Sequence, residues 1–94
     1  MGRSSKRKPK RLAEKLLQIR IALGLSQNEM IRRLELSKEL VQASISGYEL
    51  GMRVPPLPVL LRYAEVAGVC TDILINDKLD LPDKLPGKPR HTSH

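Results

Sequence analysis

The side chains that most often carry out covalent or metal chemistry are scarce in this sequence, and their spacing fits no reaction centre. Cys70 is the lone cysteine, and no histidine lies close along the chain to activate it as a nucleophile. His91 and His94 come at a spacing that makes no metal site. The three aspartates between residues 77 and 83 lack the glycine of a calcium-binding loop. We therefore expect no catalytic or metal-binding residues, no cofactor, and a protein that is not an enzyme.

Charge is the stronger chemical signal, and it is concentrated at one end of the chain. The 94 residues carry 17 Lys and Arg against 10 Asp and Glu, a net charge of +7. Residues 1–11 hold six positive charges and no negative one, whereas residues 12–74 hold seven of each sign. Because residues 1–11 lack the apolar groups to fold alone, we expect a disordered basic arm. Such an arm suits phosphate groups; the alternative is that it only keeps the protein in solution.

The composition favours one small helical domain. Hydrophobic residues make up 40% of the chain but aromatic residues only 2%, so Leu, Ile, Val and Ala must form the core. A β-sandwich usually draws on more aromatic and β-branched residues. No apolar run approaches the ~20 residues of a membrane span, and no hydrophobic signal stretch follows the basic start. These features predict a cytoplasmic protein with no membrane partner.

Local signals delimit the first two helices. The apolar face of the first helix is formed by Leu12, Leu16, Ile19 and Leu23, which recur at helical spacing. Gly24 ends this helix, because glycine readily adopts the left-handed conformation that closes a helix. Ser26 and Glu29 form a capping box that starts a second helix at Gln27, and this helix ends near Leu36. Its buried residues are expected to be Met30, Ile31 and Leu34.

Two further helices follow. The third is predicted from Lys38 to Leu50, with Ser37 as its N-cap and Gly51 at its end. Its inward residues are expected to be Leu40, Val41, Ile45 and Tyr48. The fourth has Pro58 in its first turn and ends at Gly68. Its buried residues are expected to be Val59, Leu60, Tyr63, Ala64 and Ala67.

A short fifth helix and a tail complete the chain. Thr71 is the predicted N-cap of the fifth helix, which runs through Ile75. Leu-Pro pairs beyond Asn76 prevent a long helix, so residues 77–94 are expected to be an extended or disordered tail. The tail leucines expected to seal the edge of the core are Leu79, Leu81 and Leu85.

The connections between these helices resemble those of the lambda-repressor-like (XRE-type, Cro-like) helix-turn-helix family. The family enters its second helix through Gly-Leu-Ser-Gln, which stands at residues 24–27. Residues 44–55 match its Ser-Ile-Ser-x-Tyr-Glu-x-Gly-x-Arg-x-Pro exit from the third helix, and residues 63–69 match its fourth helix. The resemblance implies an all-α, five-helix lambda-repressor-like helix-turn-helix domain over residues 12–76. A basic N-terminal arm and an extended Pro-containing C-terminal tail flank it.

The resemblance also implies a function. The second helix would lie across the DNA backbone while the third enters the major groove of a double-stranded operator. The chain would then be a sequence-specific transcriptional regulator, expected to act as a repressor and to associate with the nucleoid when bound to DNA. A homodimer is the family norm, and the fifth helix with the tail leucines is our expected dimer surface. No small-molecule ligand is expected, because no space remains for a sensing domain.

Individual roles follow from the same resemblance. Gln27 would donate to a phosphate, and Arg53 would contact the backbone or the minor groove. The outward positions of the third helix are Gln42, Ala43, Ser44, Ser46 and Gly47. Among these Gln42 can pair with adenine, the serines can reach a base or phosphate, and Ala43 can touch a thymine methyl. The arm cations expected along the phosphates are Arg7, Lys8, Lys10 and Arg11. Arg20 and Glu49 match family positions that form an ion pair between the first and third helices.

Two departures from the family pattern leave alternatives open. Four extra residues separate Gln27 from Ile45, so either the turn is enlarged or the third helix gains an N-terminal turn. In the second case Lys38 approaches a phosphate. Gly47 has no side chain to read a base, which indicates a close approach of DNA or a partner helix, or a tolerated imperfection. A protein-interaction module, such as an antitoxin or a coactivator-like bridge, is the alternative function that these departures favour.

Overall fold

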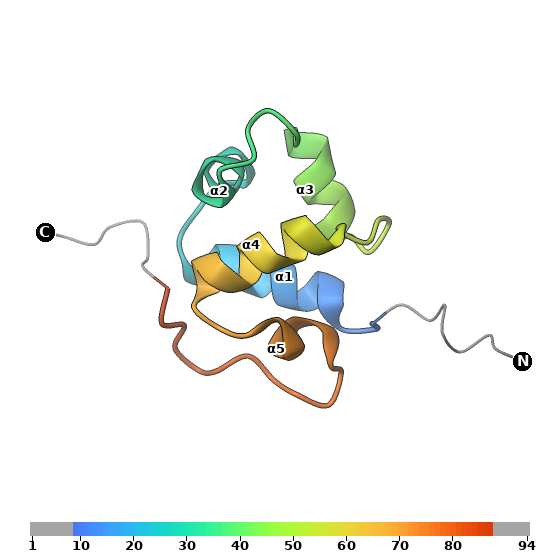
Figure 1. Ribbon diagram of the computed structural model, residues 1–94, viewed down its shortest axis with the longest axis vertical. Coiled ribbons are helices and arrows are strands. Elements are labelled where there is room, and N and C mark those ends of the chain that lie inside the picture. Colours follow the sequence, from blue (N-terminus) through green and yellow to red (C-terminus); the bar gives the residue numbers. More distant parts are fainter. Residues whose placement is uncertain (1–8, 88–94) are drawn as a thin grey trace, which may run out of the picture.

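The computed structural model describes residues 9–87, and within this range the chain is helical with no strand. The five helices are α1 (Leu12–Ala22), α2 (Gln27–Leu34), α3 (Gln42–Glu49), α4 (Leu57–Ala67) and α5 (Thr71–Ile75). Figure 1 shows α1 and α4 at the centre of the domain, with α2 and α3 on one side and α5 on the other. The expected helical class is therefore confirmed.

The signals predicted in the connection between α1 and α2 are confirmed. Gly24 follows α1 with a positive φ of 72°, in the left-handed region that glycine tolerates. The Ser26 side chain accepts from the Glu29 N–H while the Glu29 carboxylate accepts from the Ser26 N–H, at 3.1 and 2.7 Å. This capping box starts α2 at Gln27. The helix ends at Leu34, two residues before the expected end, because Glu35 turns to a left-handed conformation with φ 62°.

The predicted start of the third helix is wrong. Residues 36–40 form a separate turn, in which the Leu40 N–H donates to the Leu36 carbonyl at 2.9 Å. Val41 is extended, with ψ 172°, so α3 begins only at Gln42. Leu40 is buried as expected, but Val41 is 65% exposed and does not point inward. The four extra residues therefore enlarge the turn, and Lys38 lies in that turn instead of on the helix.

The fourth and fifth helices lie close to their expected positions. α4 contains Pro58 in its first turn and ends at Gly68, whose φ is 78°. The five residues predicted to be buried on α4 are all buried. α5 begins at Thr71 with Cys70 as the N-cap, so the prediction of Thr71 as the cap is wrong by one residue.

One aliphatic core joins the helices. The side chains at its centre, all fully buried, are Leu16, Ile19, Met30, Leu34, Ile45, Tyr63, Ala67 and Leu74. α3 packs on α1 and α2, while α4 contacts α2 and α5. Burial of Ile45 and Tyr48 holds α3 against the domain by one face only. Burying such side chains stabilises a fold by roughly 1.5–3 kcal/mol each.

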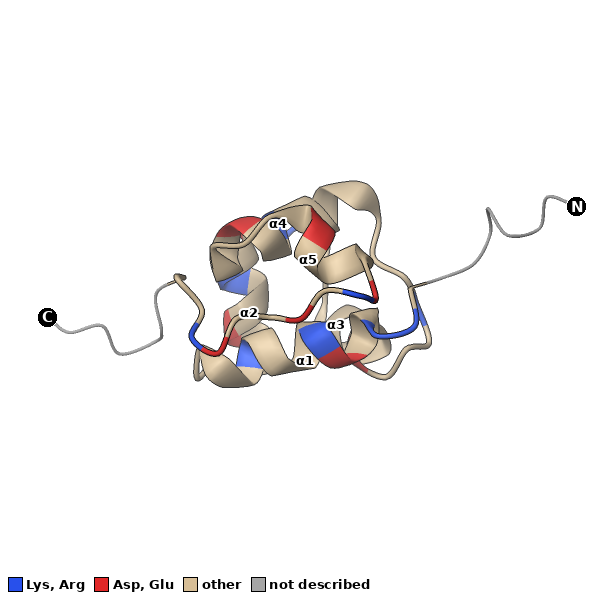
Figure 2. Cartoon of the chain, turned by 90° about the horizontal axis from the view of Figure 1, so that it is seen from below, with Lys and Arg blue, Asp and Glu red and all other residues tan. Residues whose placement is uncertain are grey.

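The segment after α5 runs extended along the domain (Figure 2). Leu81 and Leu85 pack against the core as expected, whereas Leu79 is exposed. Gly87 donates its N–H to the Ala67 carbonyl at 2.9 Å. A Cβ at Gly87 would lie 1.9 Å from the Val66 carbonyl oxygen, so only glycine allows this approach. The segment thus packs against the core and against the end of α4.

Candidate nucleic-acid interface

The outward face of α3 is partly open to solvent. Gln42 and Ala43 are exposed, and Ser44, Ser46 and Gly47 are half-buried. The first turn of the helix is therefore its most accessible part. The structure brings the five predicted positions onto one short helix, and none of them is fully buried.

An ion pair between Arg20 of α1 and Glu49 of α3 holds the far end of this helix. Arg20 Nε and Nη2 donate to the two carboxylate oxygens of Glu49, at 2.7 and 3.0 Å. The Glu49 side chain is 5% exposed and that of Arg20 is 18% exposed. The hydrogen bond to Glu49 raises the pKa of Arg20. Arg20 Nη1 also donates to the Leu25 carbonyl at 3.0 Å, so one guanidinium ties α1 to α3 and to the loop before α2.

Gln27 extends the ion pair to the exposed end of α3. Its Nε2 donates to Glu49 Oε1 at 3.1 Å, and its Oε1 accepts from Gln42 Nε2 at 3.1 Å. Gln27 is half-buried and Gln42 exposed. The sequence pointed to each of these residues separately, and the structure joins them into one hydrogen-bonded series.

Ser44 has a local structural role at the start of α3. Its Oγ accepts from the Val41 N–H at 3.2 Å and so satisfies one backbone donor at the start of α3. The hydroxyl proton remains a donor, because a serine hydroxyl both donates and accepts.

Gly47 is explained by Arg53, a contact that none of the expected alternatives included. A Cβ on Gly47 would lie 3.1 Å from Arg53 Cδ and 3.3 Å from Cγ. The Gly47 carbonyl also accepts from the N–H groups of Met52 and Arg53, at 2.9 and 3.2 Å. The missing side chain lets the stem of Arg53 lie along α3. Arg53 is therefore placed beside the helix end.

Arg32 is a candidate residue that the sequence did not single out. It is exposed on α2 and lines a hollow of about 320 Å³ between α2 and α3, together with Asn28 and Gln42. Lys38 is exposed in the turn that connects the same two helices. The signal in the sequence was that Arg32 follows Gln27 by about one and a half turns and lies outside the apolar positions of the same helix. This signal becomes informative only once the position of α3 is known.

The last two residues of the basic arm, Lys10 and Arg11, are anchored to the segment after α5. The N–H groups of Lys10 and Arg11 donate to the two carboxylate oxygens of Asp77, at 2.9 and 3.0 Å. These bonds lower the pKa of Asp77. Arg11 also bonds Asp80 at 2.6 Å, which raises the pKa of Arg11. Arg11 is thus engaged within the domain, while Arg7 and Lys8 lie outside the described residues.

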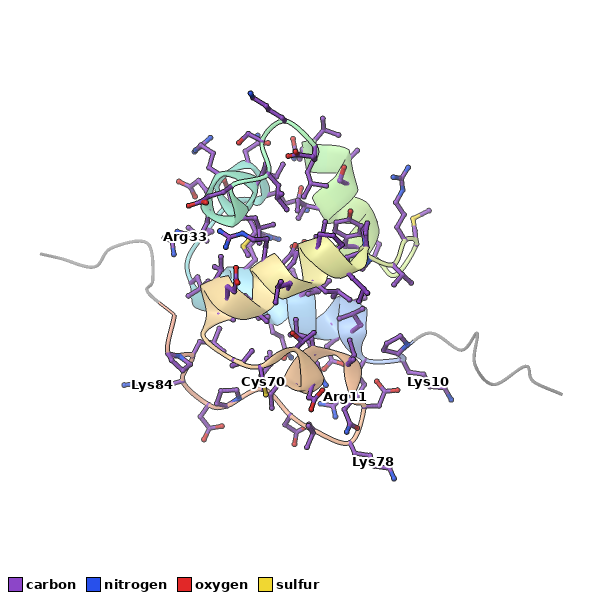
Figure 3. All side chains as sticks on the ribbon, in the orientation of Figure 1. Lys10, Arg11, Arg33, Cys70, Lys78 and Lys84 are labelled. Carbon is purple, nitrogen blue, oxygen red and sulfur yellow. The ribbon has the colours of Figure 1, made fainter. Side chains whose placement is uncertain are left out.

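Lys10 remains beside the third helix. It lines a cleft of about 360 Å³ with Tyr48, Gly51 and Arg53, between the start of α1 and the loop after α3. Figure 3 shows the Lys10 side chain pointing away from the domain. Lys10 therefore lies on the side of the domain where α3 ends.

Among residues 9–87 no group of His, Cys, Asp and Glu side chains is placed to hold a metal ion. Cys70 is exposed at the start of α5. The helices of the same range are too short or too polar to cross a membrane.

Comparisons with protein-family models, curated proteins and solved structures gave no match.

Proposed function

We propose that this chain is a sequence-specific double-stranded-DNA-binding domain that acts as a transcriptional repressor. The observation that carries the proposal is the way α3 lies on the domain. One face of the helix is buried in the core, and its first residue, a glutamine, is exposed. Hydrogen bonds from α1 and α2 hold this helix in one position. A short helix fixed at the surface suits the major groove, which is about 12 Å wide.

Base reading is assigned to the first turn of α3. The Gln42 amide offers a donor and an acceptor, which match N7 and N6 of adenine. Ala43 beside it is exposed and suits a thymine methyl group. Ser46 is half-buried and reaches a base edge or a phosphate through its hydroxyl.

Phosphate contacts are assigned to the cations around α3. Arg32 and Lys38 lie on the side of α2, whereas Arg53 and Lys10 lie near the end of α3. Two groups on opposite sides of the helix would orient it in the groove, because phosphate contacts position a protein without reading sequence. Gln27 has one amide proton left for a phosphate after its bond to Glu49.

A homodimer is part of the proposal, with a different surface from the one expected. Leu74 is fully buried, and Leu81 and Leu85 pack on their own core, which leaves Ile75 and Leu79 as the exposed large apolar side chains of the expected surface. Several exposed apolar side chains instead lie in one stretch of the chain, from the end of α3 to the middle of α4: Leu50, Met52, Val54, Leu57 and Leu61. The one charge among residues 50–61 is Arg53, so two copies can approach here despite a net charge of +7. Two-fold pairing would place half-sites about 34–36 Å apart or multiples of that distance.

Selection of binding sites from random duplex DNA, at two salt concentrations, tests the proposal. The expected result is a pseudo-palindromic consensus with an adenine in each half-site, and its loss in a Gln42→Ala variant. Gln18→Ala is the matched control, because Gln18 is an exposed glutamine on α1 whose amide bonds Glu14 of the same helix. Binding without any consensus would contradict sequence-specific recognition.

The apolar residues of 50–61 also favour a second candidate function, binding of a different protein by the same fold. Large exposed apolar patches mark interaction sites. A stable heteromeric complex that excludes DNA would support this function, whereas a symmetric dimer that binds duplex DNA would support the first.

A further inference from the structure

The segment after α5 supplies the N-terminal cap of α1. Arg11 stands at the N-cap position of this helix, and its own side chain makes no capping hydrogen bond. The Asp77 carboxylate takes that role, because its two oxygens accept from the N–H groups of Lys10 and Arg11, at 2.9 and 3.0 Å. A carboxylate at this end of a helix is favoured by the unpaired N–H groups and by the helix dipole. Lys10 and Arg11 are therefore fixed through their backbone by a residue 67 and 66 positions away in the sequence.

The side chains of these two neighbours lie in different surroundings. Arg11 turns back onto the segment after α5, where Nη1 donates to the Asp77 carbonyl at 2.8 Å and Nη2 to Asp80 Oδ1 at 2.6 Å. The Lys10 side chain is exposed and points away from the domain (Figure 3), beside the cleft that it lines with Arg53. Of the two cations, Lys10 is the one that can reach a phosphate without breaking the ion pair to Asp80.

We propose that Asp77 is a positioning residue for DNA binding, which holds the backbone of Lys10 so that its ammonium contacts the phosphates beside Arg53. The inference rests on the proposed function, in which Lys10 and Arg53 are phosphate contacts. An unheld backbone would have to be ordered when DNA binds, and this ordering costs conformational entropy. The carboxylate fixes the backbone of Lys10 before DNA binds, so less entropy is lost on binding. An acidic residue that itself repels phosphates thereby strengthens the binding of DNA.

This role predicts an effect opposite in sign to that of charge alone. Removal of a negative charge ordinarily strengthens binding to DNA, because repulsion from the phosphates decreases. Asp77→Ala should instead weaken binding, because Lys10 loses its fixed position. Asp83→Ala is the matched control, since Asp83 is exposed on the same segment and lines a hollow with Ala22 and Leu23 at the other end of α1.

The first measurement is the Kd of each variant for the selected operator at several salt concentrations. We expect Asp77→Ala to bind roughly three- to ten-fold more weakly than Asp83→Ala at low salt, which is about the contribution of one phosphate contact. The magnitude of its log–log salt slope should be smaller by up to about one. Binding by Asp77→Ala that is as tight as that of Asp83→Ala, or tighter, would overturn the proposal.

A double-mutant cycle tests whether Asp77 acts through Lys10. Lys10→Ala should weaken operator binding by the same factor in the wild type and in Asp83→Ala. In Asp77→Ala the same substitution should cost less than about two-fold, because the contact of Lys10 is already impaired. If Asp77 only stabilises the fold, Lys10→Ala will cost the same factor in all three backgrounds, and the proposal is wrong.

Asp77→Asn, with Asp83→Asn as its control, serves if Asp77→Ala does not fold. The amide keeps the shape of the side chain but offers only one acceptor oxygen to the two N–H groups. Measured well below its melting transition, Asp77→Asn should bind the operator more weakly than Asp83→Asn, by a smaller factor than the alanine pair. Equal affinities of the two asparagine variants would contradict the role of the carboxylate.

Hydrogen exchange in the DNA-free protein separates this inference from the proposed function. The backbone amides of Lys10 and Arg11 should exchange slowly in the wild type and in Asp83→Ala but rapidly in Asp77→Ala. Rapid exchange in the wild type would show that Asp77 does not hold Lys10. If the amides are protected but the wild type binds no operator, the proposed function fails and the inference falls with it. If the wild type binds an operator and Asp77→Ala keeps the full contribution of Lys10, the inference alone fails.

Discussion

At the scale of single residues, the least expected feature is the burial of a lysine. Lys15 is 1% exposed, and its Nζ donates to the carbonyls of Ile73 and Asn76, at 2.7 and 3.0 Å. These carbonyls lie at the end of α5, where a cation satisfies acceptors left without helical partners. Burial of the ammonium lowers the pKa of Lys15. The position lies beside Leu16 on the apolar side of α1, but a lysine in a sequence predicts exposure.

The lowered pKa of Lys15 predicts a pH-dependent contribution to stability. Between that pKa and the usual value of 10.5, the unfolded chain binds more protons at this site than the folded chain. The stability of the wild type should therefore rise with pH in this window, relative to a Lys15→Met variant. Thermal melts of both proteins between pH 8 and 10.5 measure the difference, in which the tyrosine titrations cancel. A difference independent of pH would contradict the lowered pKa.

At the scale of elements, the position of α3 depends on polar contacts as well as on its apolar face. Ile45 and Tyr48 anchor the helix in the core, but an eight-residue helix is too short to be stable alone. Glu49 joins it to α1 and α2 through Arg20 and Gln27. The position of α3 therefore depends in part on one carboxylate, at the end of the helix away from Gln42.

Removal of this carboxylate should affect folding and DNA binding together. Glu49→Ala leaves the Arg20 guanidinium partly buried without its partner, which costs about 3 kcal/mol or more. We expect a clearly lower melting temperature and weaker binding to the selected operator. Glu65→Ala is the control, because it breaks an exposed pair with Arg62 and should cost less than ~1 kcal/mol. Equal melting temperatures for the two variants would show that the buried pair contributes little.

The contact between Gly47 and Arg53 gives a second prediction for this element. In Gly47→Ala the new Cβ would press on the Arg53 stem, which lies 3.1 Å away and must move. Alanine also favours the helix by up to ~1 kcal/mol, so the melting temperature should hold or rise. DNA affinity should nevertheless fall, and the salt dependence of binding should lose about one phosphate contact. Unchanged affinity at low and high salt would show that the position of Arg53 does not matter.

At the scale of the whole molecule, residues 9–87 and the two terminal segments differ in charge. Residues 9–87 carry eleven basic and ten acidic side chains, a net charge of +1, so +6 of the total +7 lies outside them. Arg11, Lys15, Arg20 and Arg62 are engaged in ion pairs or hydrogen bonds within the domain. Long-range attraction to DNA would therefore come mainly from the terminal segments.

Deletion of residues 2–8 should separate affinity from specificity. About six phosphate contacts per subunit give a log–log salt slope near −5 for the full chain. The deletion removes four basic residues and should reduce the magnitude of that slope by roughly 3–4. Preference among duplex sequences should persist, because the contacts of Gln42 lie on α3. Titrations at several salt concentrations measure both effects; an unchanged slope would mean that this segment only keeps the protein in solution.

Signals that act over a few residues were sufficient for most of the fold. The capping box at Ser26, the end of α1 before Gly24 and the end of α4 at Gly68 all follow from neighbouring residues, and the structure has them where they were predicted. The start of α3 did not follow from such signals. Ser37 resembles an N-cap, but burial of Leu40 is satisfied by a turn that leaves Val41 extended.

The sequence by itself determined most of the helix boundaries, the aliphatic core and the glutamines and serines of the candidate interface, because periodicity and capping are local. Tertiary structure alone decided which of these polar groups meet. The bonds of Asp77 to Lys10 and Arg11 join residues more than sixty positions apart, and the burial of Lys15 depends on carbonyls 58 and 61 positions away. The series from Glu49 through Gln27 to Gln42 likewise exists only where three helices pack together. Such contacts depend on how whole elements pack, and no short stretch of sequence carries that information.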